Sequence, residues 1–340
     1  MATERARLGL LCLPRSVATA VADARLAEEV GFSLVGVADS QSVFREMYAT
    51  MALCAQATRR VRIGPSVTNP VTRHPAVAAS GIATVDEIAP GRAFFGIGSG
   101  DSAILNLAER PATLAGLRAY IETVRSLHTT GEGTWHGRPA RLTWVKRAIP
   151  IYLAAEGPRT LELAGEIADG VIVNVGLEPS LVRDAVAHVH AGARRAGRDP
   201  ATIDLWTMVR ANVTGDVGAG IDEIRMELAS NAHHVFRFTL EGKHVPGDLA
   251  DAIHRVQKGY QPAAHEALGP SPNAALLDAE PALRAYLAER FAVVGPPDVC
   301  ARKLRAVVEA GIGGLLITGF VADRARLIRA LGEAVLPGLP

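Results

Sequence analysis

The chain alternates short apolar runs with helical segments along most of its 340 residues. Eight of these runs have the character of buried β-strands, and most of them finish in Gly, Ser, Asn or Asp. In chain order they are 8–13, 34–39, 61–69, 91–101, 149–156, 170–175, 203–213 and 314–319. This order predicts an α/β fold in which each strand is followed by a helix.

The spacing of small and apolar residues predicts helices between the strands. Ala20, Ala24 and Ala27 recur at i, i+4 and i+7, and Gly31 follows as a helix stop. Eight strand–helix units fit a (β/α)8 TIM barrel, which typically needs about 250 residues and grows longer by insertions. We therefore predict one barrel domain spanning residues 1–340. An open doubly wound sheet is the alternative, but it normally has a Gly-rich turn after its first strand, and none is present here.

Two segments interrupt the alternation and are predicted insertions, 105–148 and 214–287. The first contains Gly and Trp residues over 130–140 that are typical of a hairpin or a lid. Insertions after barrel strands are where substrate specificity usually resides. The insertions themselves give little indication of what they bind.

Composition excludes several classes of protein. Hydrophobic residues make up 49% of the chain, charged residues 21%, and the formal net charge is +1. Without a Lys/Arg run, the chain lacks the basic surface of a nucleic-acid binder. The apolar stretch near the amino terminus is too short for a signal peptide or a membrane span. Cys12, Cys54 and Cys300 are odd in number and widely spaced, which favours reduced core thiols and a cytoplasmic location.

Polar residues follow four of the predicted strands, at the end of a barrel where chemistry takes place. They are Asp39 with Ser40, then 66–69, 99–101 and 156–160. Each has a structural interpretation as well: a Gly-rich turn is often only a tight connection, and Asp39 or Asp101 would serve as a helix cap. Four such ends meeting on one rim favour a cofactor pocket.

Segments 63–75, 91–101, 149–158 and 164–170 together resemble the luciferase-like flavin and deazaflavin oxidoreductases. Within that superfamily the chain is most similar to the branch of F420-dependent methylenetetrahydromethanopterin reductases. The resemblance implies a barrel that binds coenzyme F420 in a cleft at the carboxyl-terminal rim. It also implies a non-prolyl cis peptide between Ser66 and Val67, in a bulge behind the deazaflavin ring.

The same resemblance assigns the cofactor-binding residues. Asp39 and Asn69 would face the ring, and Ser99 and Gly100 would line its other side. The phosphate and tail groups would be held at the start of a helix, which favours anions, by Glu156, Gly157, Arg159 and Thr160. Because a carboxylate repels a phosphate, we expect only the backbone of Glu156 to take part, or its side chain to point away.

The implied chemistry is hydride transfer between C5 of the deazaflavin and a substrate carbon. Asp101 is the candidate for supplying or removing a proton, and Asp39 is the second candidate catalytic residue. The chain departs from the reductase pattern because Leu10, Leu11 and Cys12 supply no carboxylate in the first strand, and Ser40 replaces a common histidine. These changes favour a substrate less charged than a pterin, such as an activated alkene, imine or alcohol.

Two other functions compete with F420-dependent hydride transfer. One is an FMN-dependent luciferase-like monooxygenase that uses reduced flavin and dioxygen. The other is a barrel that binds its cofactor without turnover. By resemblance we expect a homodimer or higher homo-oligomer that acts on a small molecule.

Histidines give no predicted metal site. His233 and His234 are adjacent, and His188 and His190 are two residues apart, so neither pair has the i, i+4 spacing of a helical zinc site. Solvated helix positions are the favoured interpretation of His233 and His234. His74 follows the third strand and is predicted near the rim, within reach of substrate.

Overall fold

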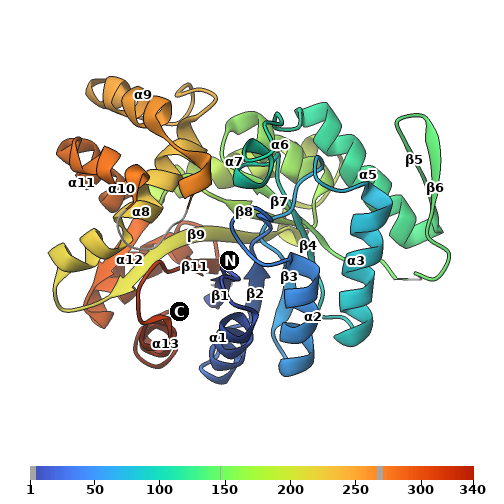
Figure 1. Ribbon diagram of the computed structural model, residues 1–340, viewed down its shortest axis with the longest axis horizontal. Helices are drawn as coiled ribbons and strands as arrows, with labels where there is room; N and C mark the ends of the chain where they lie inside the picture. Colours follow the sequence, from blue (N-terminus) through green and yellow to red (C-terminus); the bar gives the residue numbers. More distant parts are fainter. Residues whose placement is uncertain (1–4, 146, 266–270) are drawn as a thin grey trace.

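The computed structural model describes residues 5–145, 147–265 and 271–340, which form a barrel of parallel strands surrounded by helices (Figure 1). Eight strands follow one another in the order β3-β2-β1-β11-β9-β8-β7-β4, and two isolated bridges, Ile63–Ala93 and Thr68–Ile97, join β3 to β4. The sheet therefore nearly closes on itself, and the predicted (β/α)8 barrel is confirmed. The barrel strands are β1 (Arg7–Cys12), β2 (Leu34–Val37), β3 (Arg62–Pro65), β4 (Phe95–Ile97), β7 (Ile151–Ala155), β8 (Gly170–Val173), β9 (Asp204–Val213) and β11 (Gly314–Thr318).

Helices cover the outside of the barrel. Outside the larger insertion, the α-helices of the described residues are α1 (Val17–Glu29), α2 (Met47–Ala57), α3 (Pro75–Ile88), α4 (Ser102–Leu105), α5 (Leu114–Thr130), α6 (Pro158–Ile167), α7 (Pro179–Arg195), α12 (Pro297–Glu309) and α13 (Arg324–Arg329). Ala20, Ala24 and Ala27 of α1 are all buried. The three cysteines are free and buried, as predicted.

Aromatic rings fill the inside of the barrel. Phe94, Tyr152 and Trp206 belong to one buried cluster, distinct from the larger core between strands and helices. Glycines in the strands leave room for these rings: a Cβ at Gly314 would lie 2.3 Å from the Trp206 ring, and one at Gly170 would lie 2.2 Å from Tyr152. The interior of the barrel is thus packed rather than hollow, which leaves its rim for a ligand.

The amino-terminal end of the barrel is closed by a charged cluster around Asp204, the first residue of β9. Arg7 and Arg62, at the starts of β1 and β3, each place a nitrogen 2.8 Å from its carboxylate. Tyr152 donates its hydroxyl at 2.5 Å, and Trp206 donates its indole N–H at 3.0 Å. One carboxylate therefore joins four strands at the face opposite the rim.

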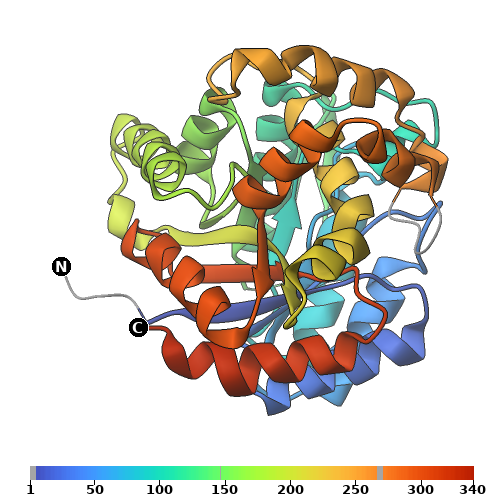
Figure 2. The same cartoon turned by 90° about the vertical axis from the view of Figure 1, so that its left-hand side faces the viewer.

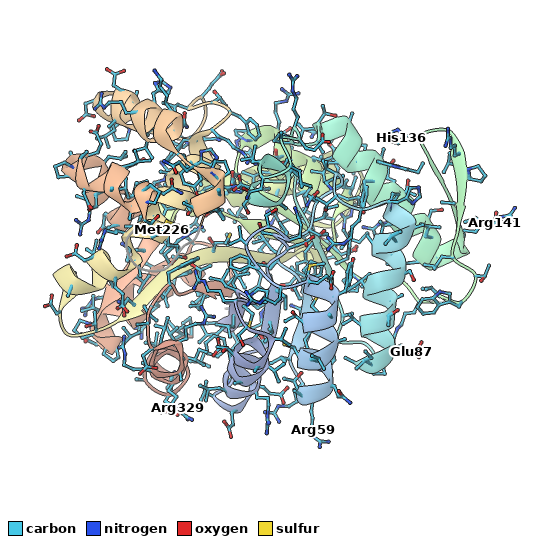
Figure 3. The ribbon with its side chains drawn as sticks, in the orientation of Figure 1. Arg59, Glu87, His136, Arg141, Met226 and Arg329 are labelled. Atoms are coloured by element: carbon cyan, nitrogen blue, oxygen red, sulfur yellow. The ribbon has the colours of Figure 1, made fainter. Side chains whose placement is uncertain are left out.

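The two insertions lie on opposite sides of the barrel (Figure 1). The larger one is mainly helical and contains α8 (Val217–Phe236), α9 (Ala250–Gly259), α10 (Pro272–Asp278) and α11 (Pro281–Phe291). The smaller contains α5 and a hairpin of β5 (Glu132–Trp135) and β6 (Arg138–Arg141). In Figure 3, His136 and Arg141 of this hairpin lie far from Met226 of α8. The hairpin packs against α5, where Trp135 contacts Tyr120 edge to face.

Several predicted boundaries were wrong. Segment 61–69 is a strand only to Pro65, and segment 91–101 is a strand only over Phe95–Ile97. In both segments the backbone then turns away from the sheet toward the rim. A ninth strand, β10 (Ala292–Gly295), was not predicted; it pairs with the last four residues of β9 (Figure 2 shows this side of the molecule). Across the described ranges, no helix is both long enough and apolar enough to cross a membrane.

Candidate active site

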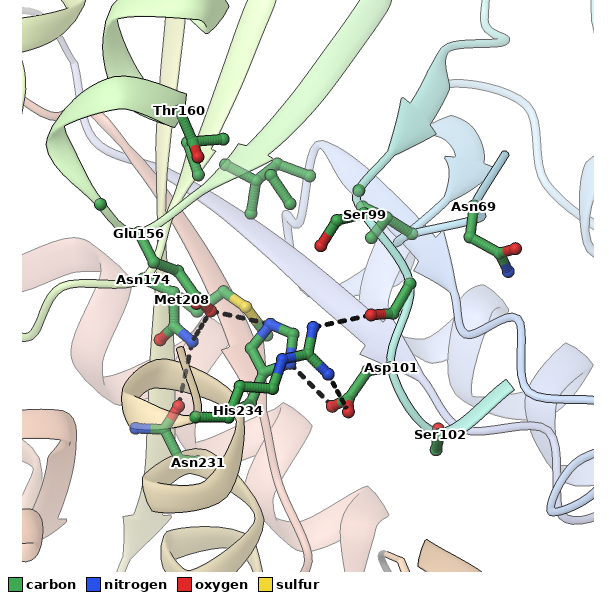
Figure 4. A pocket seen from close by; sticks show the side chains of 18 of the residues that line it. Asn69, Ser99, Asp101, Ser102, Glu156, Thr160, Asn174, Met208, Asn231 and His234 are labelled. Carbon is green, nitrogen blue, oxygen red and sulfur yellow. Dashed lines mark hydrogen bonds and ion pairs between the residues drawn. The ribbon is translucent and has the colours of Figure 1, made fainter. Parts of the chain in front are cut away.

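A cleft of about 1030 Å³ opens at the carboxyl-terminal ends of the strands. All eleven residues predicted for the site line it: Asp39, Ser66, Val67, Asn69, Ser99, Gly100, Asp101, Glu156, Gly157, Arg159 and Thr160. They come from the ends of β2, β3, β4 and β7 and from the start of α6 (Figure 4). The barrel thus brings together residues that lie far apart in the sequence.

The floor of the cleft is apolar. Leu11, Ala154, Ile172 and Met208 line it from four different strands, and Val67 lines it from the segment after β3. The peptide bond between Ser66 and Val67 is cis, as the resemblance implied. A small-molecule site of this kind combines an apolar wall with a few placed polar groups.

Asp39 holds the segment after β3 in place. Its carboxylate accepts a hydrogen bond from the Thr68 hydroxyl at 2.6 Å and pairs with Arg73. The alternative role as a helix cap is wrong, because α2 is capped by the side chain of Glu46. Asn69 likewise accepts from the backbone N–H groups of Val71 and Thr72, both at 2.9 Å. These two side chains fix the rim of the cleft beside the bulge.

Asp101 occupies the N-cap position of α4, but its side chain does not cap the helix. It turns instead toward α8, where Arg237 donates to Oδ1 at 2.5 Å and the Nδ1 of His234 lies 2.7 Å from Oδ2. Arg237 also donates to the carbonyl of Gly100 at 2.6 Å. The Gly-rich turn after β4 is therefore tied to the insertion.

His234 bridges two carboxylates across the cleft (Figure 4). Its second ring nitrogen, Nε2, lies 2.8 Å from Oε1 of Glu156. The prediction that His234 is a solvated helix residue was wrong, because α8 folds over the rim and presents this face to the cleft. The same prediction was wrong for His233, because its ring stacks on that of Tyr260, with 4.1 Å between the ring centroids.

The charges in this cluster stabilise one another. Burial acts against the charged ring of His234, but Glu156 and then Asp101 outweigh it and raise its pKa to about 9. Burial also acts against ionised Asp101, yet His234 and Arg237 hold the pKa of that carboxyl well below its usual range. Both groups are therefore charged at neutral pH.

Glu156 faces the barrel rather than the start of α6. Its Oε1 accepts from His234 and, at 3.1 Å, from the amide of Asn174. Asn174 in turn accepts from Arg210 at 2.6 Å. The side chain thus points away from the predicted phosphate position, which agrees with the expectation that only its backbone would serve there.

The start of α6 has the features of an anion site. Gly157 is the N-cap and has no side chain, and a Cβ there would meet only Lys243, at 3.9 Å. Arg159 is exposed, and within the described residues its guanidinium has no hydrogen bond or ion pair. Open backbone, a helix N-terminus and two cations together fit an anionic group.

Sequence reasoning missed several polar cleft residues, among them Asn174, Arg210, Arg237 and Lys243. For Arg237 and Lys243 the signal was the insertion after the seventh strand, since a segment that leaves the carboxyl end of a barrel strand begins at the rim. Asn174, in contrast, directly follows β8, and Arg210 lies in the second half of β9 itself. His74 was predicted near the rim but is exposed, caps α3 and is not among the residues that line the cleft. No cluster of metal-binding side chains occurs in the described ranges.

The sequence from residue 5 to residue 313 matches the model of the luciferase-like monooxygenases. The chain belongs to this family. Among curated proteins, this luciferase-like chain is 28% identical to the 5,10-methylenetetrahydromethanopterin reductase of Methanolobus tindarius, over 92% of its own length and 94% of that protein. It is also 28% identical to the F420-dependent glucose-6-phosphate dehydrogenase of Nakamurella multipartita, with 92% and 90% covered.

Solved structures of the family share the architecture. The F420-dependent tetrahydromethanopterin reductase from Methanopyrus kandleri superposes with a TM-score of 0.79 at 26% identity, covering 99% of this chain and 100% of that one. An F420-dependent secondary alcohol dehydrogenase, bound to an F420-acetone adduct, superposes with a TM-score of 0.78 at 20% identity over 99% of both chains. The luciferase-like chain is therefore an oxidoreductase.

Proposed function

We propose that this protein is an F420-dependent oxidoreductase that transfers a hydride between the deazaflavin and a small organic substrate. The observation that carries the proposal is the single cleft in which an apolar floor adjoins an anion site at the start of α6. Coenzyme F420 matches this cleft, because it combines a flat ring with an anionic tail. The F420-dependent relatives support this cofactor over FMN.

The residues present fit F420. Val67 and Ala154 would support the ring, while Gly157, Arg159 and Thr160 would hold the phosphate. When bound, F420 supplies a two-electron hydride at C5. The protein would contribute position, and Leu11 and Met208 would give the ring and the substrate an apolar floor.

The cleft favours a substrate without a large charge. Leu11, in the first strand, is apolar and 5% exposed, and Asp39 is already paired with Arg73. The carboxylates of Asp101 and Glu156 likewise have a partner in His234. We infer an activated alkene, an imine, or a ketone and its alcohol as the substrate class.

Titration of the protein with F420 and FMN in parallel tests the proposal. We expect F420 to bind more tightly, followed by absorbance loss or gain at the deazaflavin band with a substrate of the proposed class. Tight binding of reduced FMN, with oxygen consumption and no response to F420, would show the alternative monooxygenase. Tight F420 binding without turnover on any member of the class would show a binding protein.

Replacing Arg159 with glutamate should weaken F420 binding about tenfold, because a reversed charge faces the anionic tail at the start of α6 (about 1.4 kcal/mol). Fluorescence titration at low salt measures the dissociation constant. Arg25→Glu is the matched control, since Arg25 is exposed on α1 and does not line the cleft. Equal affinity of both variants would place the tail elsewhere.

We also propose a homodimer or higher homo-oligomer, on the basis of the family resemblance, and a cytoplasmic location, on the basis of the three free cysteines. Light scattering after size-exclusion chromatography measures the oligomeric state. A monomer at micromolar concentration would contradict it.

A further inference from the structure

Hydride transfer to a carbonyl or imine carbon also requires a proton, and the residues expected to supply it are committed elsewhere. Asp39, the second candidate, already pairs with Arg73, and the hydroxyl of the neighbouring Ser40 lies 2.8 Å from that of Ser102. Asp101 is held ionised by two cations, so it has no proton to give at neutral pH. The proton therefore has to come from a residue on another element of the rim.

The hydrogen bonds of His234 determine its protonation state. Both ring nitrogens lie within 2.8 Å of carboxylate oxygens, and ionised carboxylates only accept. A neutral imidazole has a single N–H and would leave one nitrogen lone pair facing a negative oxygen. The ring is therefore an imidazolium with two N–H groups.

His234 is also the most open member of this cluster. Its side chain is 34% exposed, whereas those of Asp101 and Glu156 are 17% exposed. The ring lies in the middle of the cleft, between the start of α6 and the turn after β4 (Figure 4). Within this cluster the imidazolium therefore offers a larger fraction of its surface to a ligand in the cleft than either carboxylate does.

We propose that His234 is the acid–base residue of this site, an inference that rests on the proposed function. During reduction, hydride from the reduced deazaflavin forms the new C–H bond of the substrate. The π electron pair of the C=O or C=N bond moves to the heteroatom, which replaces Glu156 as the acceptor at Nε2 of His234 and takes the proton as that N–H bond breaks. The cofactor is oxidised, the substrate is reduced, and the imidazole regains its proton from water; oxidation of the alcohol or amine reverses each step.

Several charged groups surround the ring and set its titration. Asp101 follows β4, Glu156 follows β7, His233 lies on α8, and Arg237 directly follows α8. Lys243 and His265 reach the same cluster from the segments after α8 and α9. The two carboxylates dominate because they contact the ring directly. Glu156→Gln should accordingly lower the pH at which His234 loses its proton.

Replacing His234 with glutamine tests the proposal, because glutamine retains a hydrogen bond to one carboxylate but carries no titratable proton. We expect kcat for reduction of acetophenone or 1-pyrroline by reduced F420 to fall about 100- to 10,000-fold, while the dissociation constant for F420 is little changed. His254→Gln is the control, since His254 is exposed on α9 and does not line the cleft.

The pH profile separates an acid–base role from a structural one. A raised pKa means that His234 is protonated below it, so reduction by the wild type should slow as the pH rises through about 9. The His234→Gln variant should lack this limb, and Glu156→Gln should move it to lower pH. If the His234→Gln variant keeps the wild-type kcat and the same fall in rate at high pH, the inference about His234 is overturned, whereas the proposal that the protein binds F420 is not affected.

Nuclear magnetic resonance of the histidine ring gives a test that requires no turnover. We expect two protonated ring nitrogens at pH 7 in the wild type, assigned by their loss in His234→Gln. A neutral ring at pH 7 would overturn the inference whatever the substrate. If instead the wild type fails to bind F420, the proposed function fails while the protonation state still stands as measured.

Discussion

Replacing Asp204 with alanine is expected to lower the free energy of unfolding by about 3 kcal/mol. The carboxylate accepts from Arg7, Arg62, Tyr152 and Trp206 at the closed end of the barrel. Removing it leaves two guanidinium groups close together without their shared counter-ion. The side chain is 20% exposed, so we place the loss at the lower end of the range for buried pairs. Urea unfolding followed by circular dichroism measures it.

The ionisation of Asp204 should also make the stability of the protein depend on pH. Burial opposes ionisation of Asp204, but its hydrogen bonds from Arg7, Tyr152 and Trp206 keep its pKa below the usual value. A carboxyl whose pKa is lowered by folding stabilises the protein above the unfolded pKa of about 3.9. This contribution is lost as the pH falls below that value. The Asp204→Ala variant should therefore show a shallower loss of stability on acidification than the wild type.

Asp298→Ala provides the matched control for both measurements. Asp298 pairs with Arg302 on the surface of α12, and the two side chains are 72% and 71% exposed. An exposed pair of this kind contributes less than about 1 kcal/mol. An equal loss in the two variants would show that the cluster at the end of the barrel has no special role.

Replacing Gly165 with alanine is expected to destabilise the protein by about 3 kcal/mol, although alanine is the better helix former. Helices α6 and α7 cross with their backbones in contact. A Cβ at Gly165 would lie 1.9 Å from the carbonyl oxygen of Val189, and one at Gly192 would lie 1.9 Å from that of Glu162. Backbone atoms cannot move aside as a flexible side chain does. Because Gly157 is the N-cap of α6, separating the helices should also weaken F420 binding.

Gly218→Ala is the control for this helix contact. Gly218 lies in the first turn of α8, and a Cβ there would come no closer than 3.5 Å to its nearest neighbour, Asp216. We expect unchanged or slightly higher stability in thermal unfolding. Comparable losses for Gly165→Ala and Gly218→Ala would contradict the close crossing of α6 and α7.

The parts of the structure that sequence analysis predicted depend on near neighbours in the chain. Apolar runs ending in small polar residues predicted the barrel strands, and Ala20, Ala24 and Ala27 predicted the buried face of α1. A barrel then requires that the carboxyl ends of its strands share one rim. That requirement is why Asp39, Asn69 and Thr160 were expected together before their positions were known.

The sequence by itself determined the alternation of elements and the strand ends that form the cleft, because both follow from local periodicity and turn chemistry. Only the tertiary structure decided what those side chains contact. His234 and Asp101 are 133 residues apart, and their contact depends on how α8 folds back over the rim. No local pattern encodes that orientation, because the packing of a long insertion sums many weak contacts with distant residues. The charged cluster across the cleft therefore became visible only in the folded molecule.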